Sequence, residues 1–193
     1  MSRDSRTLNL SYYGSLVARM GDVLFILFLN LWVSSFFHDS EISSNIDDAK
    51  RITQMISGIG GVLILVFSFA IGWASDKVSF PLSVTAIYGA RAVFSILVYF
   101  SDDPHSVMAF CALLFGYVFN GFGNIIVGAF FYKSIKQEFK GIVNGIYLFF
   151  GTVGVILISK VGAQLFEGVG IGTPFLLGAA FDISFILLMW IFK

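Results

Sequence analysis

The sequence predicts an all-α membrane protein with six transmembrane helices, and three observations predict it. Six long apolar runs fill the chain, short polar segments separate them, and only 12% of the 193 residues are charged. An average soluble domain carries about 25% charged residues. About 20 apolar residues at 1.5 Å rise cross the roughly 30 Å hydrocarbon layer of a bilayer. The runs have that length and cover residues 12–37, 52–73, 81–100, 107–132, 142–166 and 173–192.

The runs are continuous, whereas the strands of a membrane barrel are segments of about ten residues with alternating hydrophobicity. Helices satisfy their own backbone hydrogen bonds, which lipid cannot do for them. We therefore expect one bundle of six helices over residues 1–193, with the lipid bilayer around it. Lys+Arg and Asp+Glu number 12 each, so the net charge gives no indication of nucleic acid.

The distribution of basic residues predicts the orientation of the bundle. An even number of spans puts both termini on one side. That side collects Arg3, Arg6, Lys77, Lys133, Lys136, Lys140 and Lys193. The other side has Lys50 and Arg51 among the acidic residues Asp39, Glu41, Asp47, Asp48, Asp102, Asp103 and Glu167. Because cytoplasmic loops carry the excess of Lys and Arg, we expect a multi-pass protein with both termini in the cytoplasm. The sequence does not identify the membrane.

The first run follows a polar segment, residues 1–9, and is too long for the core of a cleavable signal peptide. It therefore serves as the insertion signal itself. Arg19 and Asp22 lie three residues apart within it, so they share a helix face and can pair. We expect this pair in the cytoplasmic third of the span.

Three more ionisable residues lie inside later runs: Arg91 in the third, Lys160 in the fifth and Asp182 in the sixth. Each costs at least about 2.5–3.5 kcal/mol at a helix centre on insertion scales. Lys160 is toward the outer end of its span and can snorkel. Arg91 and Asp182 are about ten residues from either end, too far to reach an interface. They are candidates for a polar cavity, a proton relay or a substrate contact, and the alternative is a buried ion pair that fixes helix register.

The second, fourth and fifth runs are rich in glycine, which lets membrane helices approach closely. The glycines are Gly58, Gly60 and Gly61, then Gly116, Gly121, Gly123 and Gly128, then Gly141, Gly145, Gly151 and Gly154. They indicate either close packing within the bundle or surfaces on which helices slide.

The glycines also suggest an internal repeat, with units of roughly 11–103 and 104–193. Tyr13, Gly14, Gly21 and Asp22 match Phe115, Gly116, Gly123 and Asn124 without a gap, and Gly58, Gly61, Val62 and Ala70 match Gly151, Gly154, Val155 and Ala163 at the same spacings. Units of three helices have opposite topology because three is odd, and inverted repeats of this kind build many transporters. The alternative is a chance match between glycine-rich helices.

Two stretches resemble the major facilitator superfamily. Gly72, Asp76 and Lys77 resemble its loop signature, in which Gly is followed four residues later by Asp and a basic residue; the second Gly and the trailing basic pair are missing. The stretch from Gly121 to Asn124, then Lys133, Lys136, Lys140 and Gly141, then Asn144 to Tyr147 and Gly151 to Gly154, is similar to spans four and five of a facilitator half, more like the C-terminal half.

The resemblance implies transport of a small solute by alternating access, with spans one and four lining the path. One half needs a second half, a self-dimer or the rest of a longer chain. The substrate or proton-coupling candidates are then Arg19, Asp22, Arg91, Asn124 and Asp182, and the gating-loop residues are Gly72, Asp76 and Lys77. The alternative is a non-transporting membrane subunit or scaffold. We expect no enzyme, metal or cofactor, since no HExxH or phosphate-loop motif occurs and the acids form no tight cluster.

Overall fold

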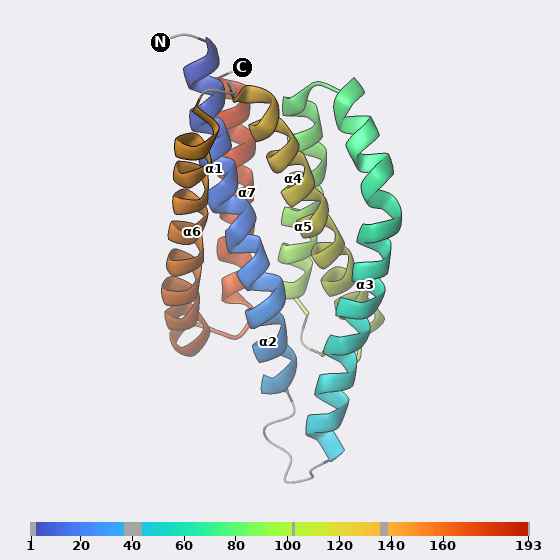
Figure 1. The fold of residues 1–193 in the computed structure, drawn as a ribbon. Helices are drawn as coiled ribbons and strands as arrows, with labels where there is room; N and C mark the ends of the chain where they lie inside the picture. The colour runs from blue at the N-terminus through green and yellow to red at the C-terminus, as the bar shows by residue number, and fades with distance from the viewer. Residues whose placement is uncertain (1–2, 37–43, 102, 136–138, 193) are drawn as a thin grey trace.

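The computed structural model describes residues 3–36, 44–101, 103–135 and 139–192. Most of these residues are helical, and none of them lies in a strand. The elements are α1 (Arg3–Val23), the π-helical segment η1 (Leu24–Phe28), α2 (Leu29–Ser35), α3 (Ser44–Lys77), α4 (Phe80–Tyr99), α5 (Val107–Ser134), α6 (Lys140–Gly168) and α7 (Thr173–Ile191). Figure 1 shows them as long rods that run side by side in one bundle.

Within the described residues, six helical segments are long and apolar enough to cross a membrane, in agreement with the predicted number of spans. They are Thr7–Ser35, Asp48–Lys77, Phe80–Tyr99, Val107–Ser134, Lys140–Gly168 and Thr173–Ile191. The first is made of α1, η1 and α2 joined end to end (Figure 1). It begins earlier than the apolar run because α1 already includes the polar residues from Arg3 onward.

The predicted gating loop is a helix in this structure. Gly72, Asp76 and Lys77 lie in the last turns of α3, and only residues 78–79 separate α3 from α4. The helix therefore continues four residues past residue 73, where the apolar run ends, and the gating role of these residues stays a prediction. The reason is local: the signature contains no proline, whereas Pro81 lies in the first turn of α4, where its missing N–H is not needed. The extended Ser79 makes the turn between the two helices.

The first span and α5 form the centre of the bundle. α1 packs against α5, α6 and α7; α5 packs against α1, α3 and α4; and α4 packs against α7. Of the most apolar stretch of each span, 61% is buried in the first span and 56% in α5, against 11% in α3 and 17% in α6. α3 and α6 are therefore peripheral, and Figure 1 shows them at opposite edges of the bundle.

The π-helical segment η1 corrects a mismatch between the sequence pattern and α-helical geometry. The buried residues of this region come in pairs four residues apart: Leu24 and Phe25, Phe28 and Leu29, Trp32 and Val33. At 3.6 residues per turn such a pattern drifts around an α-helix by about 40° per repeat. The wider turn of η1, in which the Leu29 N–H donates to the Leu24 carbonyl, offsets this drift. All three pairs consequently stay in the core.

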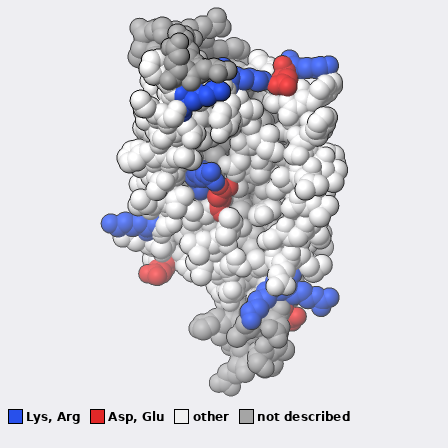
Figure 2. Space-filling view, in the orientation of Figure 1, with Lys and Arg blue, Asp and Glu red and all other residues white. Residues whose placement is uncertain are grey.

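α1 begins and α7 ends at the same end of the bundle, as an even number of spans requires (Figure 1). Figure 2 shows charged side chains mainly toward the two ends and broad uncharged surface between them. Among the charges that predicted the orientation, Lys136, Lys193, Asp39, Glu41 and Asp102 lie outside the described residues.

Candidate polar site between α1, α4, α5 and α7

A buried ion pair joins α4 to α7 near the middle of both helices. The side chains of Arg91 and Asp182 are only 3% and 1% exposed. Arg91 Nε donates to Asp182 Oδ2 over 2.9 Å, and Arg91 Nη2 donates to Asp182 Oδ1. This is a bidentate contact, the strong geometry for a guanidinium and a carboxylate. The structure thus brings together two candidates that stand 91 residues apart in the chain.

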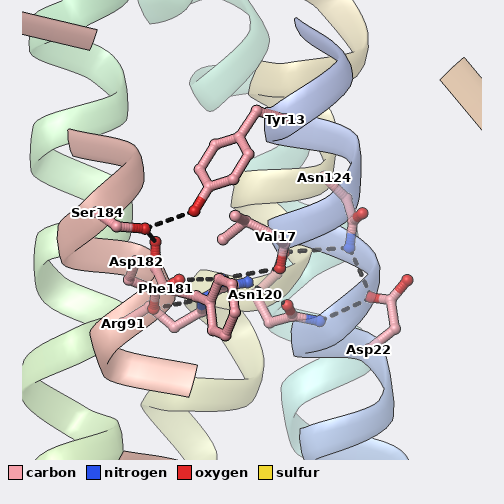
Figure 3. Close-up of polar contacts among 9 residues, drawn as sticks. All are labelled: Tyr13, Val17, Asp22, Arg91, Asn120, Asn124, Phe181, Asp182 and Ser184. Atoms are coloured by element: carbon pink, nitrogen blue, oxygen red, sulfur yellow. Dashed lines mark hydrogen bonds and ion pairs between the residues drawn. The ribbon is translucent and has the colours of Figure 1, made fainter. Parts of the chain in front are cut away.

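Arg91 also connects these two helices to α1 and α5. Its Nη1 donates to Asn120 Oδ1 over 2.7 Å, and its Nη2 donates to the Val17 carbonyl over 3.2 Å. The guanidinium lies over the Tyr88 ring, 4.6 Å from the centroid. A guanidinium has five N–H donors, and the Arg91 guanidinium makes four hydrogen bonds to these acceptors. Arg91 is therefore nearly saturated inside the bundle, as Figure 3 shows.

Gly21 makes room for this arrangement. A Cβ atom at Gly21 would collide with Asn120 Oδ1 and Arg91 Nη1. The glycine in α1 thus allows a side chain from α4 and one from α5 to meet beside the α1 backbone. Sequence reasoning did not place Gly21 or Asn120 in the site. For Gly21, the sequence offered two signals of a place in the site: it is adjacent to Asp22, and it matches Gly123 in the suspected repeat.

Asp22 extends the network to the surface. Its Oδ1 accepts from Asn120 Nδ2 over 2.9 Å and from Asn124 Nδ2 over 2.7 Å, and its Oδ2 accepts from Arg19 Nη1 over 3.0 Å. Asn120 is the link, because its carbonyl oxygen accepts from Arg91 while its amino group donates to Asp22. Figure 3 shows Asp22 on the opposite side of Asn120 from Arg91.

The Arg19–Asp22 pairing predicted from their spacing is confirmed, with Arg19 exposed and Asp22 partly buried. The Arg19 side chain is 49% exposed and the Asp22 side chain 22%. Because the first span covers Thr7–Ser35, the pair lies near the middle of its length and not in one outer third as expected. Figure 2 shows basic and acidic atoms together at mid-height over α1, with uncharged surface above and below.

Other polar contacts lie around this site. Tyr13 Oη and Ser184 Oγ share a hydrogen bond of 2.6 Å between α1 and α7 (Figure 3). Tyr88 Oη is buried and lacks a hydrogen-bond partner within the described residues. Lys160 lies exposed on α6.

The facilitator-like signature makes a second, separate contact. Asp76 at the end of α3 pairs with Lys133 at the end of α5, with 2.5 Å between Oδ1 and Nζ. Lys77 Nζ lies 4.0 Å from the centroid of the Trp73 ring. A shallow groove on α3 is lined by Ser68, Phe69, Gly72, Trp73 and Asp76. Both charges of the Asp76–Lys133 pair are more than half exposed, so the contact is easily exchanged.

The chain was compared with protein-family models and with curated protein sequences. Neither a protein-family model nor a curated protein sequence matches this chain. Within the described residues no group of three or more His, Cys, Asp or Glu side chains is placed to hold a metal ion. The function therefore has to be argued from the geometry of the polar site.

Proposed function

We propose that this chain transports a small solute by alternating access, as one six-helix half of a facilitator-type transporter. The observation that carries the proposal is the Arg19–Asp22 pair at mid-length of the first span, in which Arg19 is exposed and Asp22 partly buried. A charged group facing lipid at that depth is costly, so such groups usually face a bundle interior or a water-filled cavity. The face of α1 that bears the pair is therefore assigned to a solute path between this bundle and a second one.

The arrangement of helices supports an inverted repeat. If the first span corresponds to α5, α3 to α6 and α4 to α7, exchange of the two units turns the α1–α6 contact into α5–α3 and the α1–α7 contact into α5–α4. The α1–α5 and α4–α7 contacts exchange with themselves. All six contacts occur in the bundle, whereas the contact of α6 with α7 and that of α2 with α3 have no counterpart of similar extent. The contacts therefore support an approximate twofold relation for part of the bundle.

Side-chain contacts support the same relation. Asp22 and Asn124, which the repeat makes equivalent, bond to each other over 2.7 Å, as residues beside a twofold axis do. A Cβ atom at Gly14 would meet Val127 of α5 and Phe185 of α7. A Cβ atom at the equivalent Gly116 would meet Phe25 of the first span and Phe94 of α4. The neighbours of the two glycines thus come from exchanged elements.

The site divides into two parts in this proposal. Asp22, Arg19 and Asn124 line the path, because Arg19 is exposed and Asp22 and Asn124 are partly so. Arg91 and Asp182 stay behind them, hold α4 and α7 in register, and orient Asp22 through Asn120. The basic side, with Lys77, Lys133 and Lys140, is the cytoplasmic side, and the Asp76–Lys133 contact there is one that can break as the bundle changes state.

A second candidate function is a non-transporting membrane subunit. The saturated Arg91–Asp182 pair favours it, since a pair of this kind can serve helix register alone. The mass of the complex that is purified with this chain separates the two candidates. A stoichiometric complex with unrelated proteins indicates the subunit, and a self-dimer or a complex with a second six-helix half indicates the transporter.

The transport proposal is tested with Asp22→Asn, which keeps the shape of the side chain and removes its charge. Cells expressing the chain are screened for uptake of labelled solutes, and the variant is compared for each solute that enters. We expect loss of uptake in Asp22→Asn with normal membrane insertion, and unchanged uptake in Lys160→Gln, which removes an exposed charge on α6 outside the proposed path. Wild-type uptake in both Asp22→Asn and Asp182→Asn would end the carrier proposal.

A further inference from the structure

Arg19 and Asp22 differ in how many hydrogen bonds they can still make to a ligand. The Asp22 carboxylate accepts from three donors, while a carboxylate has about four acceptor sites. The Arg19 guanidinium has five N–H donors and makes one hydrogen bond within the described residues. Arg19 is also the more exposed partner, at 49% against 22%. The free capacity of this site is therefore positive and hydrogen-bond donating.

Arg19 is held in place at this depth. A Cβ atom at Gly151 would lie 2.9 Å from Arg19 Cγ, so the aliphatic stem of Arg19 runs against the backbone of α6. Its guanidinium is fixed by Asp22 at the other end of the side chain. The ends of the span, at Thr7 and Ser35, are about 18 Å and about 24 Å away along the helix axis. Both distances exceed the reach of an arginine side chain, so the Arg19 guanidinium lies well inside the span.

No other described arginine near the middle of a span offers the same chemistry, since the exposed Arg51 lies only three residues from the start of its span at Asp48. Arg91 is 3% exposed on its side chain and its donors are taken by Asp182, Asn120 and Val17. A cation that entered the face would meet Arg19, whose charge repels it, and an Asp22 carboxylate whose acceptors are mostly occupied. An anionic group would find a planar fork of free N–H donors, the geometry that recognises carboxylate and phosphate.

We propose that the Arg19 guanidinium binds an anionic group, carboxylate or phosphate, of the solute. The inference rests on the proposed function and names its substrate class. Asp22 is then the counter-ion that orients Arg19, and it is itself oriented by Asn120 and Asn124. Gly151 is the residue that lets α6 approach the stem of Arg19 closely enough to set this geometry.

The binding test uses purified protein and thermal unfolding in detergent. The probes are acetate, succinate, inorganic phosphate, choline, methylammonium and glycerol, compared at equal ionic strength. We expect at least one anion to raise the unfolding midpoint and the two cations and glycerol to leave it unchanged. Arg19→Gln should weaken the binding of that anion tenfold or more. Lys160→Gln, which removes an exposed positive charge on a different helix, α6, should not weaken it.

Arg19→Lys guards against a folding artefact, since it keeps the charge and loses the fork. We expect it to bind the anion more weakly than the wild type and more tightly than Arg19→Gln. Stabilisation by a cation, no stabilisation by any of the three anions, or equal anion affinity in wild type and Arg19→Gln would each overturn the inference. A response to phosphate but not to the carboxylates, or the reverse, identifies the anionic group.

Uptake of the same probes into proteoliposomes separates this inference from the proposed function. Anion binding that depends on Arg19 without any uptake supports the site and contradicts transport by this chain alone. Uptake of choline or methylammonium without anion binding supports transport and contradicts the site.

Discussion

Two arginines near the middle of this bundle have opposite surroundings. Arg91 is buried and bonded to three neighbours, whereas Arg19 is half exposed and bonded to one. A glycine on a neighbouring helix lies beside each of them. Gly21 opens the α1 backbone for the Arg91 guanidinium, and Gly151 lets the stem of Arg19 cross α6 toward the surface. At the scale of single residues, the placement of glycines thus decides which charge is structural and which is available.

Removing one partner of the buried pair should be costly at this scale. Asp182→Asn leaves the Arg91 charge buried with a weaker acceptor, so we expect it to destabilise the protein by about 3–5 kcal/mol. The double variant Arg91→Met with Asp182→Leu removes both charges and should recover most of that loss. Thermal unfolding of the purified variants measures both effects. A double variant as unstable as Asp182→Asn would show that the pair contributes more than neutralisation of a buried charge.

At the scale of the element, two helices owe their position to local backbone features. η1 keeps the pairs of buried residues from Leu24 to Val33 on one side of the first span. Gly154 brings α6 against α1, since a Cβ atom there would collide with the Leu16 carbonyl. Backbone carbonyls cannot move aside as the end of a flexible side chain can. The α1–α6 approach, and with it the position of Arg19, therefore depends on this glycine.

Gly154→Ala should push α6 away from α1 and destabilise the bundle by about 1–3 kcal/mol. Gly145→Ala is a matched control, because it lies on the same helix and a Cβ atom there has nothing within 4 Å. We expect the control to change stability by less than about 1 kcal/mol, in the direction of better helix formation. Unfolding midpoints of the two variants settle the comparison. Equal effects would mean that α6 does not approach α1 as closely as described.

At the scale of the whole molecule, the helices alternate in direction, so successive connections lie at opposite ends of the bundle. The connection at residues 78–79 lies at the end where α1 begins, and those at 100–106 and 169–172 lie at the other end. The basic residues Lys77, Lys133 and Lys140 belong to the first of these ends. Because cytoplasmic loops carry the excess of Lys and Arg, we expect that end to face the cytoplasm.

Impermeant thiol labelling of single-cysteine variants tests this topology. In a Cys111→Ala background we expect Ser79→Cys to be labelled only after the cytoplasmic side is opened. His105→Cys and Gly170→Cys should be labelled from outside in intact cells. Labelling of all three positions from one side would contradict the six-span arrangement.

Much of the fold was predictable from single residues and their spacing, and the site was predictable only in part. Arg19 and Asp22 could be paired because they are three apart on one helix, and that contact is local. The contact of Arg91 with Asp182 was open beforehand, since both were conspicuous charges but nothing in the spacing joins α4 to α7. Asn120 was one of several amides in the spans, and only its position between Arg91 and Asp22 distinguishes it.

The sequence by itself determined that this chain forms six apolar helices with few charges among them. It could do so because lipid leaves no other way to satisfy the backbone of an apolar run of about 20 residues. Only the tertiary structure decided which of those charges are buried together, which pair is left on the surface, and that the Gly72–Lys77 signature is helical. Those outcomes depend on how helices distant in the chain pack against one another, and close packing is set by side-chain shape in three dimensions, which a linear pattern does not contain.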